Sequence, residues 1–198
     1  MNYLAHAYLS FDHPEILTGN MISDFVKGKK KFEYPLLIQA GIGLHRAIDS
    51  FTDAHPVTHE ARMIFKPSYG LYSSPLMDVI YDHFLATNVF DNKSLLAFSS
   101  RTYSLLDNFT NTFPSRFHAM YPFMKQHNWL FNYQYRWGIA RSLEGLVRRS
   151  AYLTESDTAF KLFEEHYDTL QSFYSEFFPS LMKFAMETFK EYTRPPIG

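Results

Sequence analysis

The chain has 198 residues, enough for one domain, and its 19 lysine and arginine residues against 20 aspartate and glutamate residues give a formal net charge of −1. This balance argues against a general nucleic-acid-binding protein, which usually has a strong basic excess. Cysteine is absent, which excludes disulfides, thiolate nucleophiles and cysteine-ligated zinc. Neither a signal peptide nor an apolar run of the ~18 residues that span a membrane is evident. We therefore expect a cytoplasmic protein with no nucleic-acid or membrane partner.

Proline residues stand near the start of several apolar-periodic segments. Because the first helical turn tolerates proline, these segments are predicted to be helices. The predicted helices span residues 3–9, 14–26, 35–51, 75–90, 93–113, 114–127, 133–152 and 156–192. The last of them is long and is expected to bend near Pro179.

Alternating β patterns and hairpin signals are almost absent from the sequence. The fold class predicted is therefore all-α, as one helical bundle of seven to nine helices with a long C-terminal helix. We expect this single domain to cover residues 1–192, followed by a tail at 193–198.

A His/Asp ladder occupies the predicted helix 35–51 and its end. His45 and Asp49 are four residues apart, so they project from one face of a helix, and Asp53 follows one turn later. Buried carboxylates cost several kcal/mol unless a cation or hydrogen bonds compensate them, which favours a divalent metal. In the alternative interpretation, Asp53 caps the next helix and Asp49 pairs with Arg46 on the surface.

A second polar group, Asp78, Asp82 and His83, lies in the apolar helix predicted at 75–90. Asp82 and His83 diverge by about 100°, but both can reach one cluster if that edge of the helix faces it. Alone, His83 is more typical of a hydrogen-bonded core histidine. Together with the first ladder, the group favours a metal-dependent hydrolase. Imidazole and carboxylate ligands suit Mn²⁺, Mg²⁺ or Fe better than a structural zinc site.

Three further features carry charge outside the two ladders. His6 lies in an apolar segment, and Asp24 is surrounded by apolar residues just before a lysine-rich run at 27–31. Such a run is most often a solvated loop, but it also attracts acidic partners at long range. Arg148 and Arg149 lie in the helix predicted at 133–152. Their planar side chains suit phosphate, although an exposed helix flank paired with Glu144 is an equal alternative.

The motifs together resemble one known family, the acyl carrier protein phosphodiesterases. The resemblance covers most of the chain and rests on MNYLAH at 1–6, GN and DFVKG within 19–28, GLHRAID at 43–49, YDHFL at 81–85, the pair 148–149 and FFPSLM at 177–182. It implies a divergent branch of the HD phosphohydrolases, which are all-helical and metal-dependent. The implied reaction hydrolyses the phosphodiester between 4′-phosphopantetheine and a serine of holo acyl carrier protein, with manganese or magnesium as cofactor.

The resemblance also suggests roles for individual residues. The adjacent pair reads Asp82-His83 and not His-Asp as in ordinary HD enzymes, so ligands are not transferred from those enzymes one by one. The metal ligands predicted are Asp24, His45, Asp49, Asp82, His83 and, in a second tier, His6. The catalytic residues predicted are Asp53 or Asp78 as proton acceptor and Arg46 or Arg148 against the phosphoryl charge.

Two other functions remain compatible with the sequence. One is an HD-like phosphohydrolase that acts on a small phosphodiester or a nucleotide. The other is a non-catalytic helical module that binds a carrier protein, with the His/Asp residues as a buried hydrogen-bond network. The sequence makes no prediction of the oligomeric state.

Overall fold

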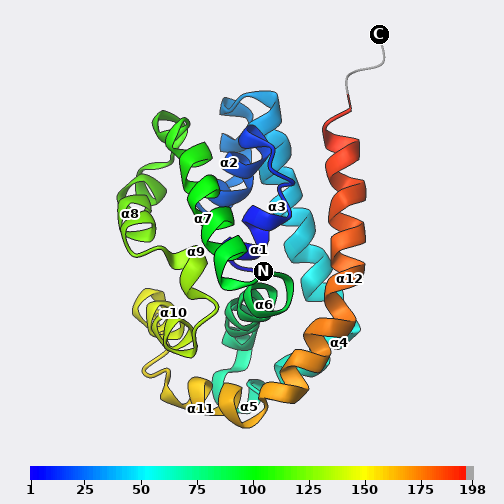
Figure 1. Ribbon diagram of the computed structural model, residues 1–198, viewed down its shortest axis with the longest axis vertical. Coiled ribbons are helices and arrows are strands. Elements are labelled where there is room, and N and C mark those ends of the chain that lie inside the picture. Colours follow the sequence, from blue (N-terminus) through cyan, green and yellow to red (C-terminus); the bar gives the residue numbers. More distant parts are fainter. Residues whose placement is uncertain (195–198) are drawn as a thin grey trace.

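The computed structural model describes residues 1–194, and this part of the chain is built from helices without a strand (Figure 1). The all-α prediction is therefore confirmed. Residues 195–198 of the predicted tail lie outside the described residues. Within 1–194, no helix combines the length and the apolar character that a membrane crossing requires.

The described residues form twelve α-helices and four 3₁₀ helices. The α-helices are α1 Tyr3–Tyr8, α2 Pro14–Ile22, α3 Leu36–Ala54, α4 Pro56–Met63, α5 Lys66–Tyr69, α6 Ser73–Val89, α7 Asn92–Asp107, α8 Ser115–Gln126, α9 Trp129–Asn132, α10 Arg136–Arg149, α11 Asp157–Glu165 and α12 Tyr167–Tyr192. The 3₁₀ helices are η1 Ser23–Phe25, η2 Gly28–Glu33, η3 Gly70–Tyr72 and η4 Thr110–Thr112.

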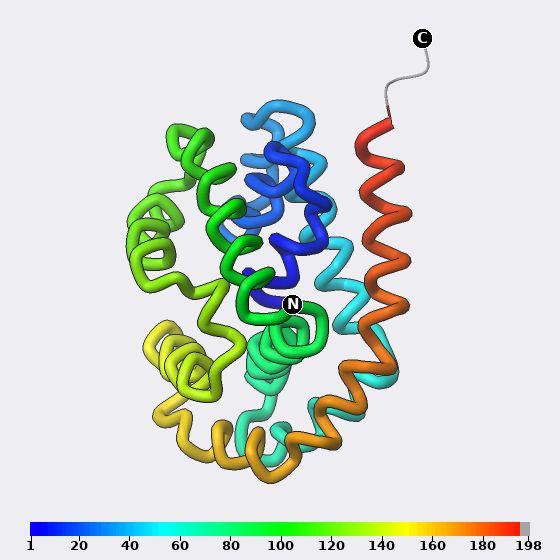
Figure 2. Tube along the Cα trace, in the orientation of Figure 1, coloured from blue at the N-terminus to red at the C-terminus, as the bar shows by residue number. Residues whose placement is uncertain are grey.

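The predicted number of seven to nine helices is too low for the described residues. Helices α4, α5 and α9 lie where no helix is predicted, and α5 and α9 have four residues each, too few to show a helical period in the sequence. The segment predicted as one helix at 156–192 is two helices, α11 and α12, which meet at His166. Helix α12 contains Pro179 and changes direction along its length before it runs straight to its end, as expected (Figure 2).

Helix α1 lies in the middle of the molecule, where it contacts α2 and α6 (Figure 1). Helices α2 and α3 pack with their backbones in direct contact at Gly19 and Gly41. A Cβ atom on Gly19 would collide with the carbonyl oxygen of Ile38, and one on Gly41 with that of Ile16. Glycine thus permits the close approach that brings the end of α2 against the middle of α3. The candidate site lies at this junction.

Candidate metal centre

Helix α3 supplies two side chains of the site. His45 and Asp49 lie one turn apart, and Nε2 of His45 is 3.0 Å from Oδ2 of Asp49. The neighbouring positions Leu44 and Ile48 are fully buried, so the apolar face of α3 is in the core while the His/Asp edge borders α1. His45 is almost fully buried, and Asp49 keeps 38% of its side chain exposed. The shared helix face predicted from the i,i+4 spacing is confirmed, and the role of the two residues as metal ligands stays a prediction.

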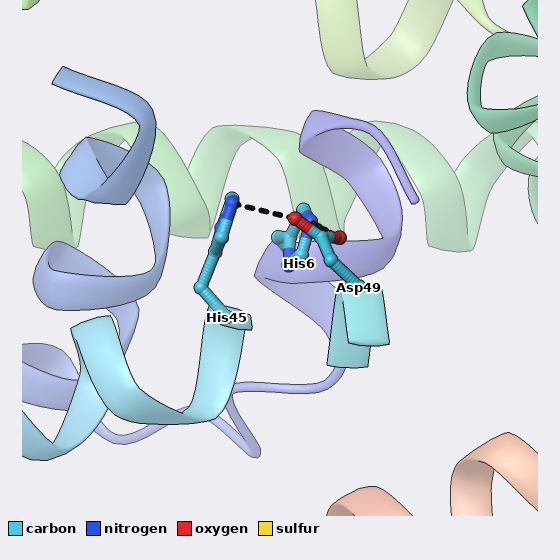
Figure 3. Close-up of side chains that lie close together, drawn as sticks. All are labelled: His6, His45 and Asp49. Atoms are coloured by element: carbon cyan, nitrogen blue, oxygen red, sulfur yellow. Dashed lines mark ion pairs between the residues drawn. The ribbon is translucent and has the colours of Figure 1, made fainter. Parts of the chain in front are cut away.

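Helix α1 supplies the third side chain, His6. Its Nε2 atom is 3.1 Å from Oδ1 of Asp49, so the two carboxylate oxygens of Asp49 face two different imidazoles (Figure 3). The rings of His6 and His45 are stacked, with their centroids 3.8 Å apart. Two parallel imidazoles beside one carboxylate therefore form the centre of the site.

Asp24, from η1, closes the site on its solvent side. Its Oδ1 atom is 3.1 Å from Nε2 of His45, while 67% of the side chain is exposed. The other ring nitrogen of His45, Nδ1, donates a hydrogen bond of 2.8 Å to the carbonyl oxygen of Asn20. Because a carbonyl oxygen only accepts, Nδ1 carries the proton and Nε2 is directed at two carboxylates. A cation, either a proton or a metal ion, is needed between them.

The charges of the cluster follow from this arrangement. Burial lowers the pKa of His45, but Asp24 and Asp49 outweigh it and raise that pKa to about 9. Burial and the neighbouring His45 lower the pKa of His6 to about 4. The imidazoles hold the pKa of Asp49 far below its usual range against the effect of burial, and hydrogen bonding to His45 lowers the pKa of Asp24. Near neutral pH both carboxylates are ionised and His45 holds the compensating proton.

The donor set fits a metal ion. Ligand atoms of His6, His45 and Asp49 all lie within 4.8 Å of one another. A ring N–H that donates to a backbone carbonyl, as in His45, is the usual arrangement of a metal-binding histidine. In His6 the proton lies on Nε2, which faces the Met1 carbonyl oxygen, so Nδ1 keeps a lone pair that is buried and has no hydrogen-bond partner within residues 1–194. Two imidazoles and a carboxylate are a common ligand set for divalent first-row metals.

Asp82, predicted as a metal ligand, holds helix α1 in place. Its fully buried carboxylate accepts hydrogen bonds from the backbone N–H groups of Asn2, Leu4 and Ala5, at 3.2, 2.7 and 3.2 Å. Burial raises the pKa of Asp82 to about 7, although the α-amino group of Met1 and the N–H donors act in the opposite direction. The carboxylate thus satisfies donors that the first turn of a helix leaves free. The structure therefore does not bring Asp82 into the cluster, and both of its oxygens have backbone partners.

His83, also predicted as a metal ligand, lies outside the cluster. Its Nδ1 atom is 2.7 Å from the carbonyl oxygen of Tyr133, and its Nε2 atom is 2.9 Å from the hydroxyl of Tyr167. Both ring nitrogens have protein partners outside the cluster, and burial lowers the pKa of the ring. His83 is a hydrogen-bonded core histidine that joins α6 to α12.

Of the residues predicted to be catalytic, one borders the site and two do not. Asp78 accepts a hydrogen bond of 2.8 Å from the α-amino group of Met1, which also lies 3.3 Å from Oδ1 of Asp49. The carboxylates hold the pKa of this amino group at about 11 despite its burial. Asp53 is instead exposed and pairs with Arg62 and Ser74, and Arg46 donates to the carbonyl oxygen of Val26. Neither of these two lies in the cluster.

Sequence reasoning missed two backbone groups, the carbonyl of Asn20 and the α-amino group of Met1. Side-chain patterns carry no signal for such groups, because their positions depend on how α1 and α2 pack. Arg148 lies on α10 and lines a cavity whose walls include none of the cluster residues, so its predicted catalytic role stays a prediction.

Comparison with known proteins gives one consistent result. The family model described as acyl carrier protein phosphodiesterase matches residues 1–181. A relative from Photorhabdus laumondii, named acyl carrier protein phosphodiesterase, is 34% identical over 186 residues, which is 92% of this chain and 94% of that protein. One of the same name from Yersinia pestis is 35% identical over 187 residues, 92% of this chain and 96% of that protein. No solved structure matches the chain.

Proposed function

Since the chain belongs to the acyl carrier protein phosphodiesterase family, we propose that it hydrolyses the phosphodiester that joins 4′-phosphopantetheine to a serine of holo acyl carrier protein. The products are the apo-carrier and 4′-phosphopantetheine. The observation that carries the proposal is the cluster of two imidazoles and two carboxylates at the meeting point of α1, η1 and α3.

A divalent cation, Mn²⁺ or Mg²⁺ with Fe as a further candidate, is proposed to bind among His6, His45 and Asp49. When bound, such an ion supplies Lewis acidity toward the phosphoryl oxygens and acidifies water at the site. Asp24 has its ionised carboxylate at the exposed edge of the cluster, where it is placed to accept a proton from the attacking water. The contact with His45 orients this carboxylate.

Intact-mass spectrometry of holo acyl carrier protein tests the function. After incubation with this protein and Mn²⁺, the carrier is expected to lose the whole phosphopantetheine group, and a chelator-treated sample should leave its mass unchanged. An unchanged carrier mass, with folded and metal-loaded protein, would contradict the proposal. It would favour the small-phosphodiester alternative, which a panel of small esters then tests.

Metal binding is expected to compete with the proton on His45. Because the pKa of His45 is about 9, each ion that binds at neutral pH must displace that proton. The apparent affinity for Mn²⁺ should therefore rise roughly tenfold per pH unit up to about pH 9 and then level off. Asp24, Asp49 and His6 have lowered pKa values and add nothing to this slope. Calorimetric titration at several pH values measures it, and an affinity independent of pH would contradict this assignment.

Docking of the carrier is proposed to involve η2 and the residues that follow it. Lys29 and Lys30 are exposed, and they stand beside two exposed apolar side chains, Phe32 (63% exposed) and Leu36 (81% exposed). Exposed lysines close in the sequence to exposed apolar residues suit an acidic protein partner. The Michaelis constant for holo-carrier is therefore expected to rise steeply with salt while the maximal rate changes little.

Charge reversal at the same surface provides the matched test. The double variant Lys29→Glu/Lys30→Glu should raise the Michaelis constant at low salt by roughly tenfold and remove most of its salt dependence. Lys161→Glu, on α11, is the control and should leave the Michaelis constant and its salt dependence as in the unmodified protein. A Michaelis constant that changes neither with salt nor in the double variant would rule out electrostatic docking at η2.

A further inference from the structure

A cavity of about 470 Å³ lies between the start of the chain and helices α9 and α10. Its walls include the aromatic side chains of Tyr3, Trp129 and Trp137 and the basic side chains of Arg148 and Arg149. The volume is within the range of small-molecule binding sites. Trp129 and Trp137 are the two tryptophans of the chain, so intrinsic tryptophan fluorescence reports on this cavity.

Two guanidinium groups converge in the cavity at Gly145. A Cβ atom on this glycine would lie 3.8 Å from Nη1 of Arg149 and 3.9 Å from Nη2 of Arg148. Within residues 1–194, neither arginine forms an ion pair. Glu144 is the one acidic residue among the described residues that line the cavity, and its predicted pairing with these arginines is not formed. The cavity thus holds an excess of positive charge, which suits an anion.

The cavity adjoins the candidate metal centre through α1. Asn2 and Tyr3 line the cavity, and His6 follows Tyr3 by about one helical turn. Burial raises the pKa of Tyr3 to about 12, while the charge of Arg149 lowers this pKa and that of Asp24 raises it. Helix α1 thus carries residues of both the cavity wall and the cluster, which connects the arginine pair to the candidate metal centre.

We propose that this cavity binds the phosphopantetheine arm of the substrate, with Arg148 and Arg149 holding the phosphate. This inference rests on the proposed function. The ligand is a phosphate ester carried on an extended, uncharged amide chain, and the cavity offers both kinds of contact. Tyr3, Trp129 and Trp137 provide apolar walls for the chain. Asn132 and Ser142, which also line the cavity, provide hydrogen-bonding groups for its amides.

Fluorescence titration of the metal-free protein tests binding separately from hydrolysis. Addition of 4′-phosphopantetheine is expected to change tryptophan fluorescence saturably. Pantetheine, which lacks the phosphate, should bind at least roughly tenfold more weakly. Adenosine monophosphate, a phosphate ester whose remaining part is a ribose with an aromatic base, should not displace the ligand. No saturable change with 4′-phosphopantetheine, or preferential binding of adenosine monophosphate, would overturn the proposal.

The variant Gly145→Leu tests the position of the site. The nearest heavy atoms to a Cβ here are the two flexible guanidinium groups at 3.8 and 3.9 Å, so a side chain fits and extends into the cavity. It should weaken 4′-phosphopantetheine binding and raise the Michaelis constant for holo-carrier, each by roughly tenfold or more, with Mn²⁺ affinity unchanged. Val147→Leu, a substitution on α10 outside the cavity lining, is the control and should change neither value.

The outcomes separate the two proposals. If the unmodified protein removes phosphopantetheine from the carrier but Gly145→Leu keeps its Michaelis constant and its phosphopantetheine affinity, the cavity assignment is wrong and the function stands. If the unmodified protein leaves holo-carrier intact, the function itself fails, and the cavity assignment fails with it. Arg149→Gln is a second variant, and it leaves the helix backbone unchanged. It is expected to lose the preference for 4′-phosphopantetheine over pantetheine.

Discussion

Replacement of Asp49 by asparagine is expected to lower the rate of holo-carrier hydrolysis by roughly 10²- to 10³-fold, because several kcal/mol of charge stabilisation at the metal ion are lost. Asparagine keeps the size of the side chain but removes the charge that faces both imidazoles and the α-amino group of Met1. The same variant should bind Mn²⁺ far more weakly. Turnover by intact-mass spectrometry and calorimetric Mn²⁺ titration measure the two effects.

Asp53→Asn is the matched control for this experiment. Asp53 lies one turn further along α3, is exposed, and pairs with Arg62 and Ser74 and not with the cluster. The identical chemical change at this position should leave turnover and Mn²⁺ affinity close to those of the unmodified protein. Near-normal turnover by Asp49→Asn, or equal losses in the two variants, would contradict the assignment of Asp49.

Replacement of Asp82 by alanine is expected to lower the free energy of unfolding by about 3–5 kcal/mol, since each buried donor left without an acceptor costs about 1–3 kcal/mol. The variant leaves the N–H groups of Asn2, Leu4 and Ala5 at the start of α1 without their acceptor. Because α1 carries His6, Mn²⁺ binding should weaken as well. Urea unfolding of the metal-free protein measures the loss of stability.

Asp91→Ala provides the comparison, because Asp91 also caps a helix. Its carboxylate accepts from the backbone of Ser94 at the start of α7, but on the surface, where water replaces the lost bond. Its effect on stability should be clearly smaller than that of Asp82→Ala. A fully stable Asp82→Ala protein without activity would show that Asp82 acts in chemistry and not in holding α1.

Much of the fold and part of the site follow from local pattern. The i,i+4 spacing of His45 and Asp49 requires only a helix, and the structure has that helix and that contact. His6 joins them only because Gly19 and Gly41 let α2 and α3 approach and because Asp82 holds α1, which are tertiary effects. The single-turn helices α5 and α9 were missed for a local reason, since four residues do not complete a recognisable helical period.

Asp82 and His83 show where pattern alone misleads. Both are buried polar residues on an apolar helix, as a metal site requires, yet their partners are far away in the sequence. Asp82 meets backbone donors near residue 4, and His83 meets the hydroxyl of Tyr167. A buried carboxylate needs hydrogen-bond donors or a cation, and the sequence does not distinguish the two.

The position of bound manganese tests the central claim most directly. A crystal of the protein grown or soaked with Mn²⁺ should show an anomalous scattering peak between the side chains of His6, His45 and Asp49. That result would assign the metal centre to the junction of α1 and α3. A peak beside Asp78, Asp82 or His83, or no peak in crystals of protein that hydrolyses holo-carrier only with Mn²⁺, would contradict the account.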